Sequence, residues 1–136
     1  MVEYASITAA LAILASSLSG AIGAVGALPA TNAKATVLIA SAARSQHVSG
    51  AEARTAYAKA PYRKTALRYL YAVAWVAAAK DRARCQAQLL LGPDPREAAA
   101  AAIRHAPGLL TRLRAAHLTV GQAATAMGRG TRDGCE

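Results

Sequence analysis

The stretch ASITAALAILASSLSGAIGAVGAL, from Ala5 to Leu28, decides how the rest of this sequence is interpreted. It lies within an uncharged run that extends to Ala33, and Pro29 follows it directly. As a helix rising about 1.5 Å per residue, it would be roughly 36 Å long, enough to cross the hydrocarbon layer of a bilayer. Proline lacks a backbone N–H and clashes with the preceding turn, so we expect this helix to end or kink at Pro29.

Small residues recur in the second half of this stretch, at Ser16, Ser19, Gly20, Gly23 and Gly26. The three glycines are spaced three apart, and Ser16 and Gly20 form a small-x-x-x-small pair. Such spacing allows the backbone of another helix to approach closely. We therefore predict close helix–helix packing through this face. The alternative is a plain single-span anchor.

The overall composition favours closely packed helices. Hydrophobic residues make up 54% of the 136 residues, yet Phe is absent and aromatic residues reach only 4%. Much of the apolar count is alanine, which buries little area, and no run of β-branched and aromatic residues is long enough for a strand. We predict an all-α protein with one long N-terminal apolar helix, followed by several shorter basic or Ala-rich helices.

Charge divides the chain into two regions. Residues 1–33 carry a single charged side chain, Glu3, whereas residues 34–136 carry all 16 Lys and Arg against the other six acids, for a net charge of +10. We predict an apolar N-terminal helix over 1–33, serving as a membrane span or filament core, and a basic helical region over 34–136. A basic region attracts an anionic partner, and both nucleic acid and anionic lipid qualify. A bias toward arginine in a GC-rich genome would produce the same composition.

Capping residues and prolines predict the element boundaries in the basic region. We expect helices over Ala33–His47, Ser49–Ala60, Ala66–Leu91, Pro95–His105, Pro107–His117 and Thr119–Met127, and an irregular tail over Gly128–Glu136. The uncharged centre of the third of these helices, Tyr69–Ala79, is too short to span a membrane unaided. We interpret that helix as buried or interfacial, with a second membrane span as the alternative.

The two cysteines, Cys85 and Cys135, leave two possibilities open. They could form one disulfide outside the cytoplasm or remain reduced inside it. Because Cys135 is the penultimate residue, a bridge would hold a Gly- and Arg-rich tail that otherwise should fray.

No arrangement of residues indicates catalysis or a metal site. The three histidines, His47, His105 and His117, have no useful mutual spacing, and neither cysteine has a Cys or His partner nearby. A nucleophile would need a base and an orienting acid, and six acids scattered through a basic body do not suggest them. We predict no enzymatic activity, no cofactor, no metal and no small-molecule substrate.

Nucleic acid is a weaker candidate as a partner. Lys59, Arg63, Lys64 and Arg68 could contact phosphates without sequence preference. Residues Leu118–Gly128 resemble the first helix and turn of helix-turn-helix domains of the MerR and excisionase type. The few residues after Gly128 leave no room for a recognition helix, so we interpret this pattern as an ordinary capped helix.

The first thirteen residues, MVEYASITAALAI, resemble the N-terminal helix of the Flp/Tad class of type IV pilins. In that family a Glu-Tyr pair opens a long apolar helix. The resemblance implies that Glu3 meets the N-terminal ammonium of a neighbouring subunit and fixes the axial register, with Tyr4 as its companion. A lone carboxylate at the head of an apolar helix is costly to bury unless it is paired. The glutamate is the third residue here rather than the fifth, and residues 34–136 have no counterpart in the shorter Flp pilins.

Three hypotheses follow for function. The first is a structural subunit of a helical, membrane-derived filament at the membrane or cell surface, with itself and membrane lipid as partners. Its assembly residues would be Glu3, Tyr4, Ser16, Gly20, Gly23 and Gly26. The second is a small single-span membrane protein with a basic cytosolic domain, either holin-like or an accessory subunit of a membrane complex. The third is a basic DNA-associated protein whose apolar N-terminus is a buried core helix.

Overall fold

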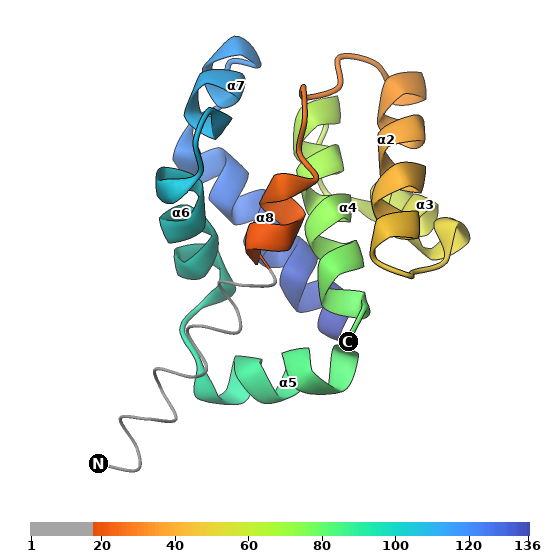
Figure 1. The fold of residues 1–136 in the computed structure, drawn as a ribbon, viewed down its shortest axis with the longest axis vertical. Coiled ribbons are helices and arrows are strands. Elements are labelled where there is room, and N and C mark those ends of the chain that lie inside the picture. Colours follow the sequence, from red (N-terminus) through yellow and green to blue (C-terminus); the bar gives the residue numbers. More distant parts are fainter. Residues whose placement is uncertain (1–17) are drawn as a thin grey trace.

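The protein is all-α throughout residues 18–136, the part of the chain that the computed structural model describes, as the composition predicts (Figure 1). No strand occurs in that range. A short helical segment over residues 18–23 is followed by α2 (Asn32–Ser45), α3 (Gly50–Lys59), α4 (Thr65–Ala79), α5 (Arg82–Leu91), α6 (Pro95–His105), α7 (Leu109–Ala115) and α8 (Val120–Cys135).

Helix α8 lies at the centre of this arrangement. It packs against α4 on one side and α6 on the other, while α2 and α3 cover α4 (Figure 1). Helix α5 crosses the end of the bundle near the C-terminus, and α7 follows α6. Helix α4 is the main core helix, because ten of its fifteen residues are buried. The first half of the helix that we interpreted as buried or interfacial, over 66–91, therefore forms the core.

The segment 66–91 is two helices rather than the single helix that we predicted. Helix α4 ends at Ala79, and the side chain of Asp81 accepts a hydrogen bond from the backbone N–H of Arg84, which caps α5. An aspartate in this position satisfies one of the free N–H groups of a helix start, so it favours a new helix over continuation of the old one. The break turns α5 across the end of α8.

The C-terminal tail is helical, which corrects the predicted irregular segment over 128–136. Helix α8 continues to Cys135 and does not stop near Met127. A side chain at Gly130 would overlap the carbonyl of Tyr71, and one at Gly134 would come within 2.5 Å of the Trp75 carbonyl oxygen. Each glycine lowers helix propensity by roughly 1 kcal/mol, so close packing against a neighbouring backbone is what keeps this segment helical.

A third glycine of α8 sits against α6. A Cβ at Gly128 would lie 2.7 Å from backbone atoms of Arg96, at the start of that helix. The exposed side chain of Arg132, one turn further on, forms an ion pair of 3.4 Å with Asp94. Helix α8 thus contacts the backbones of two helices through different glycines.

Most of the predicted helix starts agree with the structure. Asp94 accepts a hydrogen bond from the Arg96 N–H with Pro95 in the first turn, and Thr119 forms a reciprocal capping box with Gln122. The latter agrees with our interpretation of Leu118–Gly128 as a capped helix. Ser49, in contrast, precedes α3 without a side-chain hydrogen bond to it, so the expectation that a capping side chain opens this helix is wrong.

Of the predicted N-terminal apolar helix, residues 5–17 lie outside the described part of the chain, and only residues 18–23 are seen as helix. The helical segment stops at residue 23 rather than near Leu28, and the chain then runs without helix to α2. The Tyr69 hydroxyl donates a hydrogen bond of 3.0 Å to the Ala24 carbonyl, just where the helix ends, and glycine is a weak helix former. Within the part of the chain that the structure describes, no helix is long and apolar enough to cross a membrane.

We expect Gly130→Ala to destabilise the protein by about 1–3 kcal/mol, because the added methyl group must displace the α4 backbone. Gly121→Ala is the matched control. Its Cβ would meet nothing closer than the Thr119 hydroxyl at 3.7 Å, so it should be neutral or stabilise α8 by up to about 1 kcal/mol. Urea unfolding of both variants measures the difference. Equal stability of Gly130→Ala and the parent would contradict the close contact of α8 with α4.

Candidate assembly surface

The helical segment over residues 18–23 has one face in the core and one face in solvent. Leu18, Ala21 and Ile22 are buried among the residues of the main core. Ser19, Gly20 and Gly23 are exposed. The spacing of buried positions three and four apart is that of an amphipathic helix. The segment is therefore attached to the body by its apolar face, and its small residues point outward.

The predicted small-residue face is only partly present. Gly26 lies beyond the end of the helix, so it does not share a face with Gly20 and Gly23. A Cβ at Gly20 would lie 3.9 Å from the Gln46 side-chain nitrogen, and one at Gly23 would have no described atom within 4 Å. The described body therefore leaves this face open. Glu3, Tyr4 and Ser16 lie outside the described residues.

A groove of about 510 Å³ adjoins this face, between residues 19–23 and α6. Its walls are mainly small and apolar, and on α6 they include Ala98, Ala101 and Ala102. Two basic side chains, those of His105 and Arg112, also line it. The groove carries no acidic side chain among its described lining residues.

Arg112 is the most unusual polar group of this surface. Its side chain is half-buried, and its Nε has no hydrogen-bond partner among the described residues. The same side chain also lines a second groove, where it is accompanied by Lys64 at the start of α4. A buried N–H without a partner carries the desolvation cost of that group, roughly 1–3 kcal/mol.

Of the four basic residues predicted to contact an anion, one makes hydrogen bonds within the protein and three are exposed. Arg68 donates to the carbonyls of Tyr57 and Ala58 at 3.1–3.2 Å, and its guanidinium lies over the Tyr57 ring. It therefore satisfies the last carbonyls of α3 through its Nε and one terminal nitrogen, and contact of this residue with an anion stays a prediction. The other three, Lys59, Arg63 and Lys64, are exposed. Contact of these three with an anion stays a prediction.

A buried tyrosine–carboxylate pair was not predicted from the sequence. The Tyr71 hydroxyl of α4 donates to Asp133 of α8, and the Tyr62 ring lies 6.3 Å from the Tyr71 ring. Burial raises the pKa of Tyr71 well above its usual value, and the hydrogen bond to Asp133 raises it further. Burial also raises the pKa of Tyr62, and the positive charge of Arg129 partly offsets this increase. This cluster holds the second half of α8 against α4.

We expect alkaline pH to weaken the fold through its buried tyrosines. Burial raises the pKa of Tyr69 from 10.0 to about 12. Its contribution to stability is therefore complete below pH 10 and is lost as the pH rises toward about 12. The Tyr69→Phe variant should lose less stability across this window. At neutral pH the free energy of unfolding of this variant should be lower than that of the parent by about 1 kcal/mol, because the Ala24 carbonyl loses its hydrogen-bond donor. Urea unfolding at several pH values tests this, and parallel pH profiles would contradict it.

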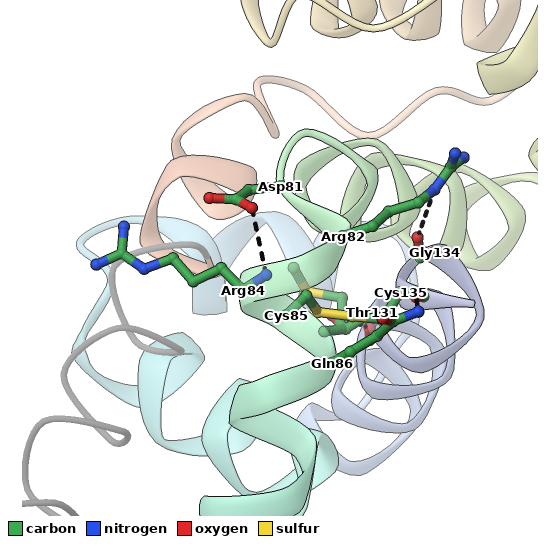
Figure 2. The surroundings of a disulfide bond; sticks show 9 residues. Asp81, Arg82, Arg84, Cys85, Gln86, Thr131, Gly134 and Cys135 are labelled. Atoms are coloured by element: carbon green, nitrogen blue, oxygen red, sulfur yellow. Dashed lines mark hydrogen bonds between the residues drawn. A yellow bond between two sulfur atoms is a disulfide. The ribbon is translucent and has the colours of Figure 1, made fainter.

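Cys85 and Cys135 form a disulfide that joins α5 to the end of α8, with their Cα atoms 5.6 Å apart (Figure 2). Hydrogen bonds surround the bridge. The Gln86 amide donates to the Cys135 carbonyl at 2.6 Å, and the Arg82 Nε donates to the Gly134 carbonyl at 3.3 Å (Figure 2). The final carbonyls of α8 would otherwise lack partners, so α5 caps the C-terminus of this helix.

We expect Cys85→Ser and Cys135→Ser each to lower the free energy of unfolding by about 2–4 kcal/mol, since either one removes the link between residues fifty apart. The double variant should be no less stable to unfolding than the single variants. Urea unfolding and mass spectrometry under non-reducing conditions measure both points. Two free thiols in freshly isolated protein would contradict the bridge and argue for a cytosolic body.

Among residues 18–136, no group of three or more His, Cys, Asp and Glu side chains could hold a metal ion. Comparisons with protein-family models, curated proteins and solved structures find no match for this chain.

Proposed function

We propose that this chain is a structural subunit of a helical, membrane-derived filament of the pilin-like kind, in which the N-terminal helices of many copies pack together. The observation that carries this proposal is the orientation of residues 18–23. Their apolar face is held in the core by Leu18, Ala21 and Ile22, whereas the small residues Ser19, Gly20 and Gly23 face outward. A helix held in this way moves with its body, and its small residues can accept another helix at short distance.

The sequence of the N-terminal region supports the same function. The small residues lie at the end of an apolar stretch in which Glu3 is the only charged side chain. The resemblance of residues 1–13 to Flp/Tad-class pilins gives Glu3 the role of fixing the register between subunits. An uncharged stretch of this length finds an apolar environment either in a bilayer or among its own copies.

The disulfide favours this proposal over a cytosolic body. Disulfides persist in secreted and surface proteins and are rare where thiols are kept reduced. The bridge ties the most exposed helix of the body, α5, to the chain end. A single-span protein with a basic cytosolic domain would have less use for it. A DNA-associated protein is the remaining alternative. In that case the basic side chains would contact DNA, and the small-residue face would have no role.

We expect Gly23→Leu to reduce assembly while leaving the fold intact. A Cβ at this exposed position would meet no described atom within 4 Å, so the body can accept a side chain there, but a leucine would hold a neighbouring helix away. Negative-stain microscopy gives the fibre yield, and thermal unfolding checks the body. Ser41→Leu, at an exposed position of α2, is the matched control and should assemble like the parent. Fibres of normal yield from Gly23→Leu, or a parent that forms no fibres, would overturn the proposed function.

A further inference from the structure

The groove beside residues 19–23 is lined by small residues on both sides. Its walls include Ser19 and Gly23 on one side and Ala98, Ala101 and Ala102 of α6 on the other. Alanines spaced three and four apart form one stripe of a helix surface, and such small side chains allow a third helix to approach both walls. Larger side chains would have filled the space.

The charges in the groove restrict what can occupy it. Arg112 and His105 are the ionisable side chains among its described lining residues, and no carboxylate accompanies them. The Arg112 Nε is buried without a partner in the described structure. The best occupant is therefore an apolar helix that carries a single negative charge.

The chain contains one segment of that description. Residues 1–17 are apolar apart from a few small polar side chains, and Glu3 is their only charged side chain. As a helix, residues 5–17 would be about 20 Å long, against about 16 Å for the eleven residues of α6. Residues 19–23 of the same chain already form one wall of the groove, and residues 1–17 lead directly into that wall. The occupant is therefore the segment of another copy.

We propose that this groove receives the N-terminal segment of a second copy, and that Glu3 of that copy pairs with Arg112. This inference rests on the proposed filament function and adds the contact that sets the register. The resemblance to pilins pairs the glutamate with a terminal ammonium, whereas the groove offers an arginine of the body. A guanidinium can bind a carboxylate through two parallel hydrogen bonds, so the pair would fix orientation as well as distance.

Charge reversal tests the pair. Arg112→Glu and Glu3→Arg should each raise the concentration needed for assembly about tenfold or more, because each leaves a buried charge without its partner. The double variant, Glu3→Arg with Arg112→Glu, should recover most of this loss. Thermal unfolding must show that the body of each variant is folded. A double variant that assembles no better than the single variants would overturn the pairing.

A second measurement does not depend on Arg112. The photo-crosslinking residue p-benzoylphenylalanine is placed at His105, an exposed position of α6 that lines the groove and already carries a large side chain. Filaments mixed from isotopically light and heavy chains are then irradiated and digested. We expect peptides that join α6 of one chain to residues 1–17 of another. Filaments cross-linked within one chain, or to another segment, would overturn the groove assignment and leave the proposed function standing. A parent that forms no filaments would overturn the proposed function itself.

Discussion

Helix α8 can lie against α4 only because Gly130 and Gly134 carry no side chain where the two backbones meet. The rest of the body is arranged around this contact. Gly128 brings the start of α6 to the other side of α8, and Tyr71 reaches Asp133 across the same interface. A chain with few aromatic residues and no Phe cannot build a thick core from large side chains. Its fold is stabilised by close packing between helix backbones instead.

This contact also places the two features that bear on function. Because α8 is held along α4 as far as its last turn, Cys135 comes to rest beside Cys85 of α5. Helix α4 also holds residues 18–24 against the body, because the Tyr69 hydroxyl donates a hydrogen bond to the Ala24 carbonyl next to the end of the short helical segment. The outward face of that helix is therefore fixed relative to α6, and the groove between them has defined walls. A filament subunit needs such a fixed relation between its body and its N-terminal helix.

Local signals in the sequence predicted the fold class and most helix starts, because a cap acts within one turn. Asp94 and Thr119 are examples. The helical tail was missed because the reason for its glycines lies in α4 and α6, far away in sequence. The break at Asp81 was missed because neither Pro nor Gly marks it, and the capping hydrogen bond of Asp81 is seen only in the structure. For the site, spacing indicated the small residues at Gly20 and Gly23. It could not indicate Arg112, whose partnerless Nε depends on the packing of α7, nor the role of Arg68 at the end of α3.

Native-state hydrogen exchange of the unassembled protein tests the central role of α8 most directly. The account predicts that the backbone amides of residues 129–135 are among the slowest to exchange, together with those of α4, because both helices are buried along their shared contact. Reduction of the disulfide should speed exchange in the last turn first. Exchange of residues 129–135 as fast as that of the loop between α5 and α6 would show an open glycine-rich tail. That result would contradict the account.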